Sequence, residues 1–369
     1  MATTNLEVIL DGDGHILEDN EAILKFLPSA WRDAGAIHAA TLWPPLDHLH
    51  SAKPMTTPGG LARGGKWVGP EEWNIFLQDV GIDTTVLYPT TALAYGKIVN
   101  RDYAIAVCRA YNNWLHETYL THSPRFQGMA LIPMQEPEAA VEELERAVKD
   151  LGMVGAMLPS AGLSNHLGAK EYWPVYAAAE RLDVSLAVHG GAHEGFGMDH
   201  MNVYAPVHAL GHPFGQMISL GGIIFNGIFD RYPKSRIAFL EGGIAWFLLC
   251  LERFDRSHAT HTEYRLRSDE LLGPKTDERV SVYIQQQIDA GRLFVGCEGS
   301  EPAIGFAVKS VGSAPFFFSS DYPHEVTNEL CKEEIGEILE NPDLTTADKE
   351  AILSKNTARF YKLQAAGAR

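Results

Sequence analysis

The chain has 369 residues, of which 46% are hydrophobic, and a formal net charge of −17. This apolar content is ample for a core and excludes wholesale disorder, and the length suits one large α/β barrel or two domains. The negative charge argues against nucleic acid and anionic membranes as main partners. It does not exclude an anionic small-molecule substrate, because a bound metal ion reverses the local field.

The amino-terminal sequence shows no basic segment followed by an apolar one, and no apolar run approaches the length of a membrane span. The four cysteines are far apart and lack Cys-x-x-Cys spacing. We expect them to be buried free thiols in a reducing compartment rather than disulfides or zinc ligands. These features together favour a cytoplasmic protein.

The elements can be predicted in chain order. A short strand at residues 6–10 leads into Asp11-Gly-Asp-Gly-His15, where two glycines are expected to let the backbone turn sharply. A helix is predicted over 20–35, and a Pro- and Gly-rich loop over 42–68. Strands then alternate with helices: strands at 84–88, 126–132, 154–158, 184–189, 236–241, 293–297 and 315–319, and helices at 102–119, 137–151, 171–182, 208–229, 244–254, 280–289 and 303–311.

Eight strands in strict alternation with helices predict a closed (β/α)8 TIM barrel in the α/β class. We interpret residues 1–369 as one domain. The 42–68 and 190–207 segments are expected to be active-site loops. Helices within 325–369 (residues 330–339, 346–353 and 356–363) are expected to pack outside the barrel.

Polar side chains follow the predicted strands at their carboxyl ends. Asp13 and His15 follow the first strand, His189 the fifth, Glu241 the sixth and Asp321 the eighth. In a barrel these ends meet at one mouth, so residues far apart in sequence converge there. Because carboxylates and imidazoles bind divalent cations, the pattern predicts a metal site.

Several ordered motifs resemble the amidohydrolase-related (amidohydrolase-2) family, the branch with aminocarboxymuconate-semialdehyde decarboxylase and aromatic-acid decarboxylases. The similarity spans essentially the whole chain. The motifs are Asp-x-Asp-x-His-x-x-Glu at 11–18, His-Gly-Gly at 189–191, Gly-His-Pro-Phe at 211–214, Gly-Ile-Phe-Asp-Arg-Tyr-Pro at 227–233 and Ser-Asp-Tyr-Pro-His at 320–324.

The resemblance implies a single Zn²⁺ or Mn²⁺ ion in the barrel mouth. The ligand positions of the family fall on Asp13, His15, His189 and Asp321, and an open position remains for water or substrate. Asp321 is also a candidate to accept a proton from bound water. Because family members often dimerise, the resemblance implies a homo-oligomer or a hetero-oligomer with a related chain.

Two positions depart from the family pattern. Asp13 stands where a histidine is common, which shifts the preference from zinc toward Mn²⁺ or Fe²⁺. Glu241 stands where many members carry an acid/base histidine. It can serve as the proton shuttle if its pKa is raised, or as a metal ligand. With His193 and His212 it can hold a second ion; alternatively, His193 lies in a glycine-rich loop and His212 packs at a helix start.

Three functions follow. The first is a metal-dependent hydrolase or non-oxidative decarboxylase of a small carboxylated or cyclic substrate, with Glu241 and Asp321 as catalytic groups. The second is a dinuclear non-haem iron or manganese oxygenase on the same scaffold. The third is a metal-binding partner subunit of a heteromeric enzyme. Tyr322 and His324 are expected to have supporting roles around the site.

Overall fold

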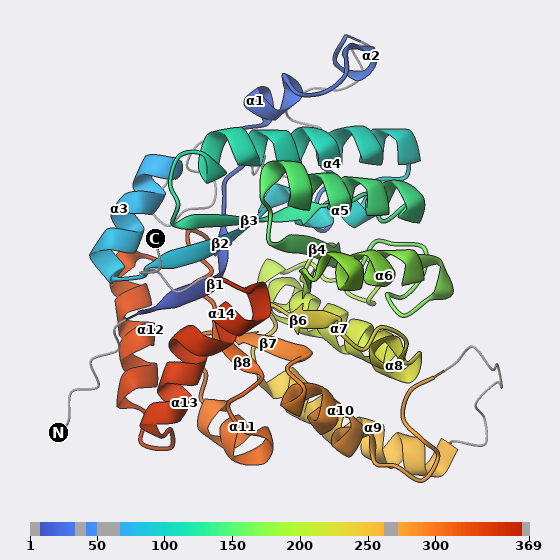
Figure 1. Ribbon diagram of the computed structural model, residues 1–369, viewed down its shortest axis with the longest axis vertical. Helices are drawn as coiled ribbons and strands as arrows, with labels where there is room; N and C mark the ends of the chain where they lie inside the picture. Colours follow the sequence, from blue (N-terminus) through green and yellow to red (C-terminus); the bar gives the residue numbers. More distant parts are fainter. Residues whose placement is uncertain (1–7, 34–41, 50–66, 262–271, 364–369) are drawn as a thin grey trace.

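The computed structural model describes residues 8–33, 42–49, 67–261 and 272–363. Eight parallel strands lie side by side in the order β1 to β8, and helices cover the outside (Figure 1). Backbone hydrogen bonds from Asp321 N to Asp13 O (3.0 Å) and from His15 N to Tyr322 O (2.6 Å) join the end of β8 to β1. The predicted (β/α)8 barrel is therefore confirmed.

The strands match the predicted positions to within one or two residues, apart from β1. Each is short and buried along almost its whole length, as expected where helices cover the outer face of the sheet. They are β1 (Leu10–His15), β2 (Thr84–Tyr88), β3 (Phe126–Leu131), β4 (Gly155–Pro159), β5 (Ser185–His189), β6 (Arg236–Phe239), β7 (Leu293–Cys297) and β8 (Phe316–Phe318).

The helices follow the strands around the barrel. The principal ones are α3 (Pro70–Val80), α4 (Arg101–Leu115), α5 (Pro137–Leu151), α6 (Trp173–Leu182), α7 (Tyr204–Phe225), α9 (Ala245–His261), α10 (Val280–Asp289), α11 (Ile304–Val311) and α12 (Asn328–Glu340). Shorter ones are α1 (Asn20–Leu24), α2 (Ser29–Arg32), α8 (Ile228–Arg231), α13 (Thr346–Glu350) and α14 (Asn356–Tyr361).

The first strand differs from the prediction. The Asp-Gly-Asp-Gly-His motif lies inside β1, whose register shifts between Asp11 and Gly14, and it is not a sharp turn after a strand at 6–10. A Cβ atom on Gly12 would lie 2.5 Å from the Phe317 ring, and one on Gly14 would lie 2.5 Å from Trp73. The glycines are thus required by the close packing of β1 against β8 and α3.

Three helical predictions also need correction. Helix α3 was not predicted, although its Trp73 and Phe76 are fully buried. The helix expected at 20–35 is divided into α1 and α2, because Pro28 lies between them. Helix α7 spans Tyr204–Phe225 instead of 208–229, so the last residues of the predicted 190–207 loop form its first turn. Of the predicted 42–68 loop, residues 50–66 lie outside the described residues.

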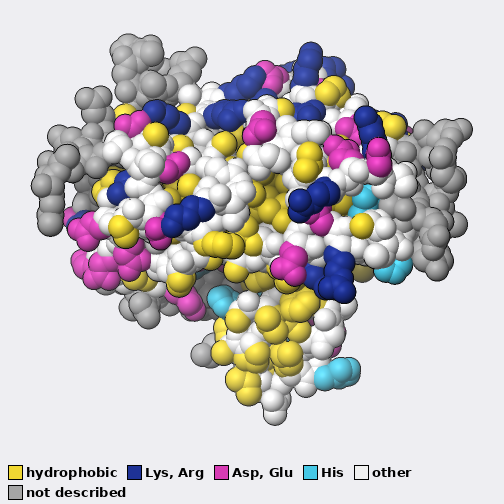
Figure 2. Space-filling model, turned by 90° about the horizontal axis from the view of Figure 1, so that it is seen from below, with side chains coloured by type: hydrophobic (Ala, Val, Ile, Leu, Met, Phe, Trp, Pro, Cys, Tyr) yellow, Lys and Arg dark blue, Asp and Glu magenta, His cyan; other side chains and the backbone are white. Residues whose placement is uncertain are grey.

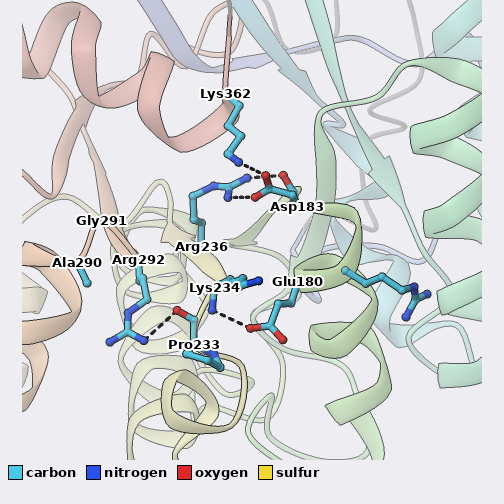
Figure 3. A pocket seen from close by; sticks show the side chains of 10 residues that line it. Glu180, Asp183, Pro233, Lys234, Arg236, Ala290, Gly291, Arg292 and Lys362 are labelled. Atoms are coloured by element: carbon cyan, nitrogen blue, oxygen red, sulfur yellow. Dashed lines mark hydrogen bonds and ion pairs between the residues drawn. The ribbon is translucent and has the colours of Figure 1, made fainter.

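The amino end of the barrel is closed by α14. Tyr361 donates a hydrogen bond to the Gly12 carbonyl (2.6 Å), and its hydroxyl also contacts that of Tyr88 (2.6 Å). Arg236, at the start of β6, donates to the Phe360 carbonyl (3.0 Å) and to Asp183 Oδ1 (2.6 Å). The other carboxylate oxygen of Asp183, Oδ2, pairs with Lys362 (Figure 3). Arg236 and Lys362, two of the cations that line a cleft at this end of the barrel, therefore have structural partners.

The surface gives two further observations. Figure 2 shows hydrophobic side chains gathered on a lobe that projects at its lower edge. On α7, Leu210, Phe214 and Ile218 are large exposed hydrophobic residues four positions apart, a spacing that places them on one helix face. An exposed hydrophobic surface of this kind is suited to contact with another chain. The predicted oligomer stays a prediction. Among the described residues, no helix is long and apolar enough to cross a membrane, and all four cysteines are buried free thiols.

Candidate metal centre

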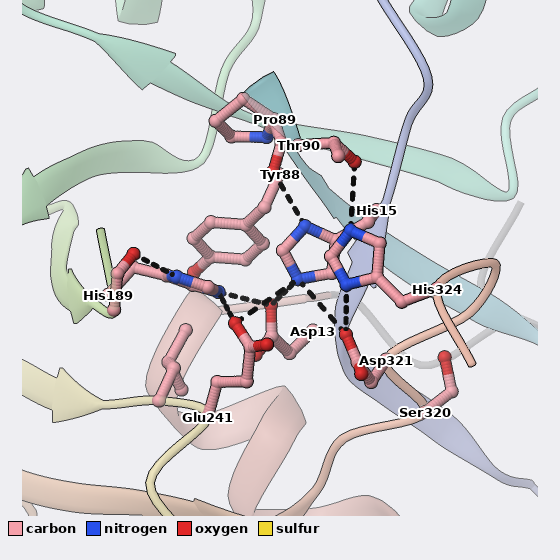
Figure 4. Close-up of polar contacts among 12 residues, drawn as sticks. Asp13, His15, Tyr88, Pro89, Thr90, His189, Glu241, Ser320, Asp321 and His324 are labelled. Atoms are coloured by element: carbon pink, nitrogen blue, oxygen red, sulfur yellow. Dashed lines mark hydrogen bonds and ion pairs between the residues drawn. The ribbon is translucent and has the colours of Figure 1, made fainter. Parts of the chain in front are cut away.

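Five of the candidate side chains converge at the carboxyl end of the barrel (Figure 4). Asp13 and His15 lie on β1, His189 ends β5, and Glu241 and Asp321 follow β6 and β8. His15 Nε2 lies 3.5 Å from Asp13 Oδ1 and 3.5 Å from Asp321 Oδ1. His189 Nε2 lies 3.4 Å from Asp13 Oδ1 and 3.3 Å from Glu241 Oε2.

The donor atoms at this centre fit a cation. One ligand atom from each of Asp13, His15 and His189 lies within 4.8 Å of the others, and all three residues are buried. Both oxygens of Asp13 and the Nε2 atoms of His15 and His189 have no hydrogen-bond partner. A buried polar atom without a partner costs about 1–3 kcal/mol, so such a cluster is stable only if something fills it. A divalent ion satisfies all of these atoms at once.

The two histidines are oriented for metal binding by backbone carbonyls. His15 Nδ1 lies 2.6 Å from the Pro89 carbonyl oxygen, and His189 Nδ1 lies 2.9 Å from that of Gly190. A neutral imidazole that donates from Nδ1 keeps the lone pair of Nε2 free. Both Nε2 atoms point into the centre (Figure 4).

The electrostatics show what it costs to assemble these groups without a cation. Burial raises the pKa of Asp13 to about 6, and burial lowers the pKa of His15 well below its usual value. Burial also lowers the pKa of His189, but the Asp13 and Glu241 carboxylates outweigh it and raise that pKa to about 9. A bound divalent ion supplies the positive charge that favours carboxylates and neutral imidazoles together.

Glu241 and Asp321 share an uncommon backbone conformation. Their φ angles are +54° and +53°, in the left-handed region that non-glycine residues rarely adopt. Holding a side chain there costs on the order of 1–3 kcal/mol and is typical of functional sites. Both carboxyl groups are turned toward the centre in this way (Figure 4).

Glu241 lies among imidazoles. Its Oε2 atom is 3.3 Å from His189 Nε2, 3.2 Å from His212 Nδ1 and 4.0 Å from His15 Nε2. Burial raises the pKa of Glu241, but His212 and the other two histidines outweigh it and hold the pKa well below its usual value. Without a bound ion these surroundings do not raise the pKa of Glu241, and its role as a proton shuttle stays a prediction.

His212 lies beside Glu241, and His193 lies beside His212. Their rings are 4.8 Å apart, both residues are buried, and His193 Nδ1 is 3.5 Å from Asp47 Oδ2. Among the described residues, the groups whose ligand atoms lie close enough to share an ion are Asp13–His15–His189 and His15–Asp321–His324. A second ion held by Glu241, His193 and His212 stays a prediction.

His324 supports Asp321. Its Nδ1 lies 2.6 Å from Asp321 Oδ1 and its Nε2 lies 2.9 Å from the Thr90 hydroxyl, which itself donates to the Ile16 carbonyl. Both ring nitrogens therefore face acceptors. Burial lowers the pKa of His324, but the Asp321 carboxylate raises it to about 9, in accord with a ring that donates twice. The ring also stacks on His15, with centroids 4.0 Å apart.

Asp11 and Glu18 are two further buried carboxylates of the first motif, and the sequence did not indicate what they do. Asp11 accepts hydrogen bonds from Thr85 Oγ1 (2.6 Å) and from both the backbone and the hydroxyl of Ser320, and so ties β1 to β2 and to the end of β8. Glu18 accepts from the backbone of Thr90 and Ala92 (2.9 Å each). Their motif, Asp-x-Asp-x-His-x-x-Glu, was the only sequence signal for them.

Two cavities adjoin the centre. The larger, about 100 Å³, is open to the outside, and its lining includes apolar Leu46 and Leu93, Thr90, and His208 and His212 of α7. The smaller, about 10 Å³, lies against β7 and β8. Glu241 and Asp321 line both cavities, so each carboxyl group is reachable from the pocket that a substrate would enter.

The comparisons with known proteins agree with this geometry. The family model described as "Amidohydrolase" matches residues 48–363. This match covers most of the chain, and the protein belongs to this family of enzymes.

Several of the related proteins are decarboxylases. The chain is 24% identical over 307 residues to gamma-resorcylate decarboxylase from Polaromonas, covering 78% of this chain and 85% of that protein. It is 25% identical over 346 residues to 2-amino-3-carboxymuconate-6-semialdehyde decarboxylase from Dictyostelium discoideum, covering 91% and 89%. The crystal structure of 5-carboxyvanillate decarboxylase from Novosphingobium aromaticivorans, complexed with manganese, has the same fold, with a TM-score of 0.71, 20% identity and 98% coverage of both chains. These relatives give the oxygenase alternative no support.

Proposed function

We propose that the protein is a divalent-metal-dependent, non-oxidative decarboxylase of a small aromatic or cyclic carboxylic acid. The buried, unpartnered ligand set of Asp13, His15 and His189, which lies beneath a small open pocket, is the observation that carries this proposal. Decarboxylases among the relatives favour decarboxylation over hydrolysis.

The ion would be held by Asp13, His15, His189 and Asp321. Two carboxylates and two imidazoles suit Mn²⁺ or Zn²⁺, and manganese in related decarboxylase structures favours Mn²⁺. When bound, the ion supplies positive charge that orients an anionic substrate and stabilises charge as it develops. We propose one ion per chain.

The pocket supports this class of substrate. Leu46 and Leu93 give it an apolar wall suited to a ring, whereas His208 and His212 on α7 offer hydrogen-bonding groups to polar substituents. The cavity size, about 100 Å³, suits a single ring. The pocket residues also keep water from the reacting carbon once substrate fills the space.

Decarboxylation requires one proton on the substrate. The bond between the ring carbon and the carboxyl carbon breaks, CO₂ leaves, and the electron pair left on the ring carbon takes a proton. We assign this transfer to Asp321, which takes the proton from the His324 ring, whose Nδ1 lies 2.6 Å from Asp321 Oδ1, and passes it to the substrate in the open pocket that Asp321 lines. Glu241, held among three imidazoles, would position the substrate and the centre.

The test is a decarboxylation assay with metal-loaded protein in D₂O. γ-Resorcylate, 5-carboxyvanillate and related hydroxybenzoates would be offered, with CO₂ release and product mass as readouts. We expect one deuterium at the carbon that carried the carboxyl group, and loss of activity in metal-free protein and in Asp321→Asn. Hydrolysis of an ester, amide or lactone panel without CO₂ release from any acid would contradict the proposal.

A further inference from the structure

A carboxyl group outside the metal centre ties together two of the loops that form the barrel mouth. Glu301 lies in the loop between β7 and α11. Its Oε2 accepts a hydrogen bond from the Ile244 backbone N–H (2.5 Å), and its Oε1 accepts one from the Glu298 N–H (2.9 Å). One carboxylate therefore bridges the loop after β6 and the loop after β7.

The β6 loop is shaped to receive this bridge. Glu241 has φ +54° and Gly243 has φ +67°, so the chain turns through two left-handed residues before Ile244. A Cβ atom on Gly243 would lie 3.2 Å from Glu301 Oε2, which means that glycine leaves space for the carboxylate. The strained conformation of Glu241 needs an external constraint of this kind to persist.

The charges around the bridge make a constraint necessary as well. Glu301 lines the cavity of about 10 Å³ together with Asp13, Glu241, Glu298 and Asp321, and no lysine, arginine or histidine among the described residues lines it. This volume is about that of one water molecule. Five carboxyl groups around so small a space repel one another when ionised, which would drive the loops apart. Two backbone donors to Glu301 oppose this.

We propose that Glu301 is a positioning residue, which by joining the two loops fixes where the carboxyl group of Glu241 faces the metal centre and where that of Glu298 faces the small cavity. It does not touch the substrate pocket, whose lining residues include Glu241 but not Glu301. Its kinetic consequence rests on the proposed function; its structural consequence does not.

The structural consequence is tested by hydrogen–deuterium exchange of metal-loaded protein. In Glu301→Gln, the amide NH₂ must face one of the two N–H donors, so one hydrogen bond is lost. We expect amides in 240–247 and 296–300 to exchange about tenfold faster or more, with the metal content unchanged. Glu72→Gln is the matched control, because Glu72 also accepts a backbone N–H (Gly69, 2.9 Å) but lies on α3.

If Glu301→Gln does not fold, Gly243→Ala disturbs the same bridge from its other side. Unchanged exchange of both segments in a folded Glu301→Gln or Gly243→Ala protein would overturn the proposal. Hydrogen–deuterium exchange does not require catalytic turnover. A failure of this proposal can therefore be distinguished from a failure of the decarboxylase proposal.

The kinetic consequence is tested by a double-mutant cycle with Glu241→Gln. Glu301→Gln should lower kcat about tenfold or more while KM changes less than about twofold, because the substrate pocket is intact. In the Glu241→Gln background the same substitution should lower kcat less than about twofold further. Equal losses in both backgrounds would show that Glu301 does not act through Glu241.

Discussion

His324 and Asp321 form a short contact between two side chains at the metal centre, with 2.6 Å between Nδ1 and Oδ1. The other ring nitrogen of His324 lies 2.9 Å from Thr90 Oγ1. Asp321 is therefore held by a chain of polar contacts that begins on the loop after β2. Substitution of Thr90 can test this chain while both Asp321 and His324 are kept.

Thr90→Val should weaken metal binding or activity about 10–100-fold, the usual effect of losing a hydrogen bond that orients a ligand. Valine has the shape of threonine but cannot accept from His324. Thr90→Ser restores the hydroxyl and should stay within about threefold of the wild type. The readout is Mn²⁺ affinity by titration calorimetry, and equal affinities of the valine and serine variants would contradict the role.

Loss of a predicted ligand should abolish metal-dependent stabilisation. Saturating Mn²⁺ at about 100 times its Kd should stabilise the wild type by about 2.7 kcal/mol. His189→Ala and Asp13→Ala should lose this gain and show less than stoichiometric metal after dialysis. His122→Ala serves as the control, because His122 is partly exposed and pairs with Glu71 outside the centre. Retention of full metal content in both ligand variants would exclude this site.

The close packing of β1 can be tested with two glycine substitutions of opposite expected sign. Gly12→Ala should destabilise the protein by about 1–3 kcal/mol, because its Cβ would lie 2.5 Å from Phe317. Gly336→Ala in α12 meets nothing within 4 Å and should stabilise by about 0.5–1 kcal/mol. Urea unfolding measures both, and a neutral Gly12→Ala would show that the barrel core can shift to accept a methyl group.

The buried Glu334 of α12 predicts a pH dependence. Its Oε2 has no partner, and burial raises its pKa from 4.5 to about 7. Between these values the folded protein keeps a proton that the unfolded chain releases, so this group's contribution to stability falls as pH rises from about 4.5 to 7.

Glu334→Gln should remove this pH-dependent contribution to stability. The difference in unfolding free energy between the variant and the wild type should therefore be more favourable to the variant at pH 8 than at pH 4.5, by on the order of 1 kcal/mol. Glu337→Gln on the exposed side of α12 should show no such difference. Urea unfolding of metal-free protein at both pH values makes the comparison, and a parallel pH dependence in wild type and Glu334→Gln would contradict it.

The fold could be predicted because its signals are local. Short apolar strands such as Phe316–Phe318, each followed by polar residues, alternate with amphipathic helices, and that alternation specifies a barrel. The convergence of Asp13, His189 and Asp321 then follows from the topology, since every strand end meets at the same mouth.

The supporting contacts could not be predicted because they depend on neighbours distant in sequence. Glu301 and Ile244 are 57 residues apart, and Thr90 and His324 are 234 apart. The pKa of Glu241 was also beyond reach, since the direction of its shift depends on how close His212 lies. Helix α3 was missed in the same way: Trp73 and Phe76 are buried by packing that its short sequence does not reveal.

The joining of β8 to β1 has a consequence for how the protein matures. Asp13 and His15 leave the ribosome first, but Asp321 follows about 300 residues later, and α14, which closes the amino end of the barrel on Gly12, comes later still. A nascent chain therefore lacks the fourth proposed ligand, Asp321, through most of its synthesis. Binding of an ion by all four proposed ligands therefore has to wait until the last strand has taken its place beside the first.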